Sequence, residues 1–309
     1  MSSGAPLNGF TAAATILMWL RAAHGQAVVR VDLDQVREGL PGSPLGKDVR
    51  VIMPPMPSPV EHCEGMLVRN PKDAAEWGIF VNPEAGPERR RFTIAHELGH
   101  FVLHRARQGS FRCDKESVHF GLDTAAVIER EADEFASNIL MPGDVLRDAI
   151  ANRPIDLKVL SDLAKTFEVS FEALCIRFIK YTDQRAILLH WDNGFLKYEW
   201  RSKKAILTRA RVRHTGDPQE PLPGTLAADA SVDQALDGVE MPASVWCAAE
   251  APHMRLREFK HSYTARDRVL TLLLLEGAEP RAWDRSWQDG ESFDSYDQFV
   301  SNGQLPDQR

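Results

Sequence analysis

Apolar residues recur at helical spacing in three long stretches of this chain. Residues 9–25, 87–104 and 124–141 place them every three or four positions, which is typical of helices with one buried face. Pro87 suits the first turn of the second stretch, and Pro142 with Gly143 ends the third. Asp32 begins a further short helix. The pattern therefore predicts a largely helical framework in the first half of the chain.

Short apolar runs bounded by proline, glycine and polar residues predict strands elsewhere. Before residue 90 they are 49–53, 65–68 and 77–82. After residue 184 the predicted strands are AILLHW (186–191), FLKYEW (195–200), KKAILTRARV (203–212) and RVLTLLLLE (268–276). Between these groups, the spacing predicts two or three short helices.

These elements predict an α+β fold with four parts. Residues 1–143 form a mixed first domain, and 144–183 a helical segment. Residues 184–280 form a mostly β domain, and 281–309 a polar tail.

Charge and cysteine usage narrow the class of protein. The net charge is −7 and the pI about 5.8, so no overall basic surface favours nucleic acid. The four cysteines form no CxxC pair, which suits free thiols in a reducing compartment. The apolar run at 9–25 is interrupted by Arg21 and His24 and is shorter than the roughly 20 residues that span a bilayer. We therefore expect a cytoplasmic protein without a membrane segment.

The candidate chemistry lies in the second long helix, which contains HELGH at 96–100. Residues four apart share a helix face, so His96 and His100 can both direct a ring nitrogen at one metal ion. Glu97 lies one position around the helix. There its carboxylate can act as general base on the attacking water without binding the metal.

The next helix offers the third ligand that a catalytic zinc ion requires. Glu129 and Asp133 are four apart, so one can bind the metal while the other orients a ligand histidine. Glu131 is the rival ligand, but it lies about 200° around the helix from Glu129. We favour Glu129 because only it shares a face with Asp133. Without HELGH, these acids would indicate only a solvated helix face.

RRFTIAHELGHFVLH (90–104), followed by EREADEFASNILMP (129–142), resembles the ImmA/IrrE family of zinc metallopeptidases. WGIFVNP (77–83) is similar to the family's strand before the active-site helix. The resemblance covers about the first 180 residues.

The resemblance implies a zincin-like, gluzincin-type domain that binds Zn²⁺, with Mn²⁺ as an alternative, through His96, His100 and Glu129. It implies Glu97 as the general base. It also implies a protein substrate, a helix-turn-helix repressor whose cleavage relieves repression in stress responses or mobile elements. His104 is expected to pack or to support a ligand. Longer members carry a sensor-like C-terminal domain, and nothing in 184–280 identifies its ligand.

The segment 144–183 resembles the family's helix-turn-helix-like region. It holds six basic and seven acidic residues, so it lacks a face that would neutralise phosphates. We expect it to pack or to dock a repressor, and direct DNA binding is disfavoured.

Several assignments stay open on sequence alone. The strand at 77–82 is a candidate edge strand for an extended substrate. His119 or a tyrosine could stabilise the oxyanion. Alternative functions are a zinc-containing transcriptional regulator and a repressor-binding protein without proteolysis. The oligomeric state is not indicated.

Overall fold

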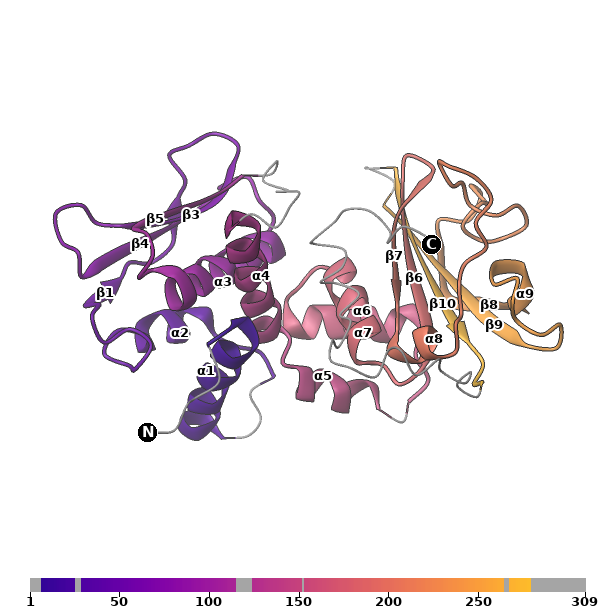
Figure 1. Ribbon diagram of the computed structural model, residues 1–309, viewed down its shortest axis with the longest axis horizontal. Coiled ribbons are helices and arrows are strands. Elements are labelled where there is room, and N and C mark those ends of the chain that lie inside the picture. Colours follow the sequence, from indigo (N-terminus) through magenta and orange to yellow (C-terminus); the bar gives the residue numbers. More distant parts are fainter. Residues whose placement is uncertain (1–6, 26–28, 115–123, 152, 264–266, 279–309) are drawn as a thin grey trace. The chain divides into compact units, whose positions relative to one another are not determined.

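The computed structural model describes residues 7–25, 29–114, 124–151, 153–263 and 267–278, and it is a mixed α/β structure with two sheets (Figure 1). The chain divides into two compact units. The N-terminal unit takes its described residues from Met1–Val145 and Lys165–Ser170. The C-terminal unit takes them from Leu146–Ala164 and Phe171–Gln298.

Among the described residues, four helices lie wholly in the N-terminal unit: α1 (Gly9–His24), α2 (Leu33–Gly39), α3 (Pro87–His104) and α4 (Thr124–Leu140). Asn8 begins α1 by accepting a hydrogen bond from the backbone of Thr11, whose hydroxyl in turn accepts one from the backbone of Asn8. Both α1 and α3 pack against α4, which buries Ala132, Phe135, Ala136 and Ile139 completely. The three long helices predicted from apolar spacing are confirmed.

The first sheet contains β1 (Val51–Ile52), β2 (Met56–Pro57), β3 (Cys63–Arg69), β4 (Glu76–Val81) and β5 (Ser110–Asp114). Its order is β1-β4-β3-β5, with β2 also paired to β4. The candidate substrate strand at 77–82 is therefore wrong as an edge strand, because β4 is hydrogen-bonded to β3 on one side and to β1 and β2 on the other. Helix α3 packs on β3 and β4.

Three short amphipathic helices follow: α5 (Gly143–Ile150), α6 (Leu157–Phe167) and α7 (Phe171–Tyr181). They confirm the prediction of two or three helices. Their apolar side chains are buried, including Leu146, Leu160, Phe167, Leu174 and Phe178. The division between the two units falls within this segment.

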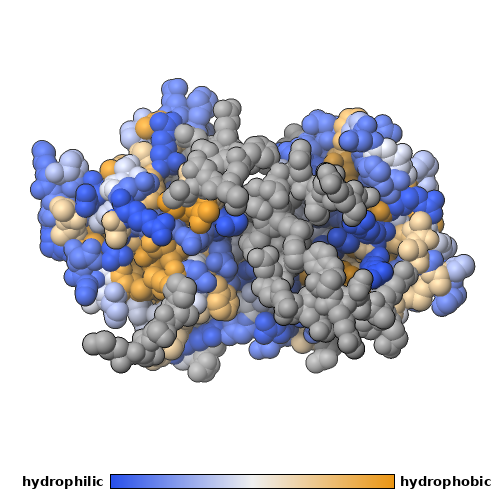
Figure 2. Space-filling model, in the orientation of Figure 1, coloured by the Kyte–Doolittle hydropathy of each residue, from blue (hydrophilic) through white to orange (hydrophobic). Residues whose placement is uncertain are grey.

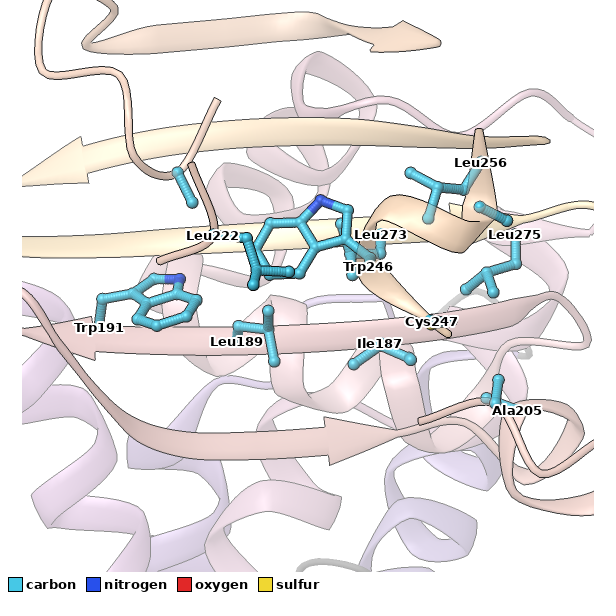
Figure 3. Packing of buried hydrophobic residues seen from close by; sticks show 13 residues of the cluster. Ile187, Leu189, Trp191, Ala205, Leu222, Trp246, Cys247, Leu256, Leu273 and Leu275 are labelled. Carbon is cyan, nitrogen blue, oxygen red and sulfur yellow. The ribbon is translucent and has the colours of Figure 1, made fainter. Parts of the chain in front are cut away.

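The C-terminal unit is built on an antiparallel sheet of order β7-β6-β10-β9-β8. Its elements are β6 (Arg185–Asp192), β7 (Phe195–Arg201), α8 (Lys203–Leu207), β8 (Gln234–Pro242), α9 (Ala243–Trp246), β9 (Arg255–Tyr263) and β10 (Arg268–Leu275). Ile187, Leu189 and Trp191 of β6 lie beneath Trp246 of α9 in one apolar cluster, which Figure 3 shows. This cluster is the core on that face of the sheet.

The strand predicted at 203–212 is wrong, because its first residues form helix α8. The Ser202 hydroxyl accepts a hydrogen bond from the backbone of Ala205 and caps this helix. Strands β8 and β9 were not predicted.

The surface facing the viewer in Figure 2 is mostly hydrophilic where described residues are seen, with apolar residues gathered over part of the N-terminal unit. Within the described ranges, every helix is too short or too polar to traverse a bilayer.

Candidate metal centre

Helix α3 carries three buried histidines on one face. His96, His100 and His104 follow one another at intervals of four residues, and their exposed fractions are 7%, 0% and 0%. Pro87 lies in the first turn of α3. Proline has no backbone N–H, and at this position an N–H would have no hydrogen-bond acceptor within the helix. A regular helix therefore lines up the three imidazoles inside the N-terminal unit.

The carboxylate of Glu129 on α4 lies next to two of these imidazoles. The Nε2 atoms of His96 and His100 are 2.9 Å apart. One oxygen of Glu129 is 3.2 Å from Nε2 of His96, and the other is 3.4 Å from Nε2 of His100. Within the described part of the chain, these three residues are the group whose donor atoms could together hold a metal ion.

The two helices can approach this closely because α3 has a glycine at the crossing. A Cβ atom added to Gly99 would lie 3.1 Å from both the Cα and the carbonyl oxygen of Ala132, and 3.2 Å from the Cβ of Phe135. Such distances are shorter than ordinary carbon contacts of about 3.5–4.0 Å. Gly99 therefore allows α4 to bring Glu129 within reach of the histidines.

The spacing of the donor atoms fits a zinc ion. Two ligands of a tetrahedral ion, each about 2.0–2.1 Å from it, are separated by about 3.3 Å. The observed separations of 2.9, 3.2 and 3.4 Å lie around that value. Two imidazoles and one carboxylate also form the donor set of many hydrolytic zinc sites, which keep a fourth position open.

The protonation states suit a metal-binding role. Burial lowers the pKa of His100 to about 4, against its ordinary 6.5, so its ring is neutral near pH 7. Burial alone would raise the pKa of Glu129, but hydrogen bonding with His100 and His96 outweighs it and holds the pKa well below its usual range. A neutral imidazole and an ionised carboxylate are the forms that bind zinc.

Asp133 lies behind His96, one turn along α4 from Glu129. Its Oδ1 is 2.8 Å from Nδ1 of His96. A carboxylate at that place accepts a hydrogen bond from the N–H at Nδ1 and leaves the Nε2 lone pair directed at the candidate metal position. Glu131, the rival ligand, instead lies 2.9 Å from Nε2 of His104.

Glu97 is fully buried between α3 and β3. A Cβ atom added to Gly65 of β3 would come within 2.4 Å of Oε1 of Glu97, so this carboxylate lies directly against the strand backbone. Gly65 was not predicted as part of the site, although an isolated glycine in a strand pattern can signal such a close approach.

Two features around His100 were not predicted from the sequence. Phe111 of β5 stacks on its ring at 4.7 Å between centroids and an interplanar angle of 17°. The other feature is His104, whose Nδ1 lies 3.2 Å from Nδ1 of His100. The candidate oxyanion residue His119 lies outside the described residues.

Comparisons with known proteins place this centre in a family. Residues 49–178 match the model of the IrrE N-terminal-like domain. The chain is 36% identical over 92 residues to the radiation response metalloprotease IrrE of Deinococcus radiodurans, covering 30% of this chain and 27% of that protein. It is 30% identical over 92 residues to the protein of the same name from Deinococcus deserti, covering 30% of this chain and 32% of the relative.

The match therefore spans about a third or less of the length of these relatives. A transcriptional regulator from Mycobacterium tuberculosis aligns in structure with 15% identity and a TM-score of 0.48, over 86% of this chain and 79% of the regulator. Residues 49–178 therefore place this part of the chain in the ImmA/IrrE family, which points to a metallopeptidase.

Proposed function

We propose that this protein is a zinc-dependent endopeptidase that cleaves a helix-turn-helix repressor. The observation that carries the proposal is the convergence of His96, His100 and Glu129, with Glu97 on the same helix. The matched relatives are both named as metalloproteases of the radiation response, which supports peptide hydrolysis and a regulatory role.

Each residue of the centre has a proposed part in hydrolysis. Bound zinc would act as a Lewis acid that polarises the scissile carbonyl and acidifies a water molecule. His96, His100 and Glu129 would hold that ion, and Asp133 would orient the ring of His96. Glu97 would take a proton from the attacking water and deliver it to the leaving amine nitrogen.

Strand β5 is the proposed binding edge for an extended substrate. Among the described strands, β5 pairs with β3 alone and stands at one end of the sheet order. Phe111 of this strand stacks on His100, one of the proposed zinc ligands, which supports the proposal. A peptide added to the edge would be held by main-chain hydrogen bonds, largely independently of its side chains.

We further propose that the helices α5 to α7, in the segment that resembles the family's helix-turn-helix-like region, dock the repressor. The stretch 144–183 carries six basic and seven acidic residues, which disfavours phosphate binding and direct contact with DNA. The C-terminal unit is a candidate sensor that regulates the reaction. For these roles the support is the resemblance to longer family members.

The test compares wild-type protein with Glu97→Gln, which keeps the shape of the side chain and removes its basicity. Both proteins, loaded with zinc, are incubated with extract of the host cell, and new peptide N-termini are labelled and identified by mass spectrometry. We expect about one zinc ion per chain in both proteins. New N-termini in a repressor should appear with the wild type only.

Three results would contradict the proposal. Equal cleavage by both proteins would remove Glu97 from its role. An intact complex with a repressor, without new N-termini, would instead indicate a binding protein. A salt-dependent shift of duplex DNA by the purified protein, again without cleavage, would indicate a DNA-binding regulator.

A further inference from the structure

A stretch rich in lysine and arginine lies on the surface of the C-terminal unit, around and after helix α8. Residues 201–214 contain six lysine or arginine residues and no acid, although the net charge of the whole chain is −7. Five of these side chains are exposed, and we call them the basic face: Lys203, Lys204, Arg209, Arg211 and Arg213. The proposed function assigns no role to the basic face.

The backbone of this stretch is fixed to the core of the unit, which directs the charges outward. Ala210 belongs to the apolar cluster of the C-terminal unit, and Val212 packs against that cluster. In 209–213 the apolar residues alternate with exposed arginines, so the arginines point away from the cluster. The backbone N–H of Arg213 donates a 2.6 Å hydrogen bond to the carbonyl of Trp246, which holds the end of the stretch in place.

The charges of the basic face are not paired with acids of the folded unit. Within the described ranges, none of its five side chains forms an ion pair with a carboxylate. Glu199 interacts electrostatically with Arg211, but its carboxylate lies 3.5 Å from Nε of Arg201, a cation outside the face. The five positive charges therefore repel one another, and an anionic occupant would relieve that repulsion.

The chain leaves the sheet beside this face. Strand β10 ends at Leu275, and the carbonyl oxygen of Glu276 accepts a 2.7 Å hydrogen bond from Nη1 of Arg185. Nε of the same guanidinium donates a 2.8 Å hydrogen bond to the hydroxyl of Thr208, the residue before Arg209. One guanidinium thus joins the exit of the chain to the basic face.

The sequence beyond this exit contains a segment of opposite charge. Residues 286–298 hold four acids and three aromatic residues, with no lysine or arginine. The segment begins ten residues beyond Glu276, and ten residues of extended chain span up to about 35 Å, so it can reach the basic face. A short tether of this kind raises the local concentration of the segment to the order of millimolar.

We propose that the acidic segment 286–298 binds the basic face of the same chain and covers it. Carboxylates of the segment would pair with the exposed cations, and its aromatic rings would pack on arginine side chains. Single exposed ion pairs contribute little, but several on one tethered segment act together. The inference goes beyond the proposed function and does not depend on the zinc site. Nucleic acid is the rival occupant, and the net charge of −7 disfavours it.

The first test uses a carbodiimide, which joins a lysine amine directly to a carboxylate in contact with it. Full-length protein is treated at low salt, the monomer is isolated, and joined peptides are identified by mass spectrometry. We expect Lys203 and Lys204 to be joined to acids of 286–298 within one chain. These products should disappear in about 1 M salt, which screens exposed charges.

A triple variant separates specific binding from chance contact. Arg209→Gln, Arg211→Gln and Arg213→Gln together remove three charges of the face and keep both reactive lysines. We expect the joined peptides to fall at least about threefold, because three modest charge pairs are lost. The matched control removes three exposed arginines elsewhere and should react like the wild type: Arg90→Gln, Arg107→Gln and Arg153→Gln.

A second variant leaves the whole described part of the chain unchanged, so its folding is not at issue. It converts the four acids of the segment to amides: Asp289→Asn, Glu291→Gln, Asp294→Asn and Asp297→Asn. Binding of a labelled DNA duplex at low salt then reports whether the basic face is covered. We expect this variant to bind the duplex at least about threefold more tightly than the wild type. Equal binding by the two proteins would contradict the inference.

The remaining outcomes would each overturn the inference. Joined peptides found only in a covalent dimer would indicate that a second copy of the chain occupies the face. Absence of joined peptides, with duplex binding by the wild type that the arginine variant loses, would indicate nucleic acid. Absence of joined peptides without duplex binding would show that the segment does not reach the face. Each of these results would leave the proposed peptidase activity untouched.

Discussion

An alanine at position 65 would test how the proposed catalytic carboxylate is held in place. Gly65 lies in β3 with its missing side chain directed at α3. A Cβ atom there would be 2.4 Å from Oε1 of Glu97 and 2.4 Å from Cγ2 of Thr93. Both neighbours are buried, so neither can swing into solvent to make room.

The magnitude follows from these two distances. Each contact would be about 1 Å shorter than an ordinary carbon contact of about 3.5 Å, so either β3 or Glu97 must shift. Overpacking of this kind costs about 1–3 kcal/mol. In a unit of this size, that cost lowers the melting temperature by roughly 2–12 °C. A 1 Å displacement of a catalytic group lowers the rate about 100-fold.

The assay combines a thermal melt, the zinc affinity and the rate of substrate cleavage. For Gly65→Ala we expect a lower melting temperature and a much lower rate. The zinc affinity should stay near that of the wild type, because the proposed ligands face α4 rather than β3. Gly39→Ala is the control, since nothing lies within 4 Å of the Cβ atom it adds.

The result that would refute the reasoning is specific. If Gly65→Ala melts and cleaves like the wild type, β3 accommodates a side chain without moving Glu97. A fall in zinc affinity as large as the fall in rate would show that the lost rate comes from the metal ligands and not from a shift of Glu97. Either result would mean that the close approach of β3 does not position the carboxylate.

Three further predictions concern the ligand support, the pH dependence and the C-terminal unit. Asp133→Asn should weaken zinc binding about 10- to 100-fold in a chelator competition, because it removes the carboxylate behind His96. Metal-free protein should lose stability as the pH falls from about 6.5 toward 4. The pKa of His100 is about 4 in the folded protein and 6.5 in the unfolded chain, so between these values only the unfolded chain binds the proton. Thermal melts at pH 7, 6 and 5 should show this loss, and His100→Phe should show less of it. Glu250→Gln should lower the melting temperature of the C-terminal unit, because Arg185 would stay buried without the carboxylate oxygen that lies 2.5 Å from its Nη2. We expect the free energy of unfolding to fall by about 3–5 kcal/mol.

The helices that carry the candidate centre were predictable because their signals are local. Apolar spacing predicted α3 and α4, and the four-residue interval placed His96 and His100 on one face. The same interval grouped Glu129 with Asp133, and the structure places both beside His96. Their roles stay predictions until metal binding and cleavage are measured.

The features that were missed depend on partners distant in sequence. Strand β9 carries Glu258, a fully buried acid that breaks the expected alternation of apolar and polar positions. Its carboxylate accepts hydrogen bonds from the backbone of Ala227 and from the indole of Trp246. No local pattern reveals those contacts, just as none reveals that Glu131 contacts His104.

The order of strands in the C-terminal sheet has a consequence for its assembly during synthesis. β6 is the first strand of that sheet to leave the ribosome and β10 is the last, yet the two are paired along their whole length in its interior. Until β10 emerges, β6 has β7 on one side and an open edge on the other. The nascent unit therefore exposes that edge and part of its apolar face, and a chaperone that shields unpaired strands would act in this interval.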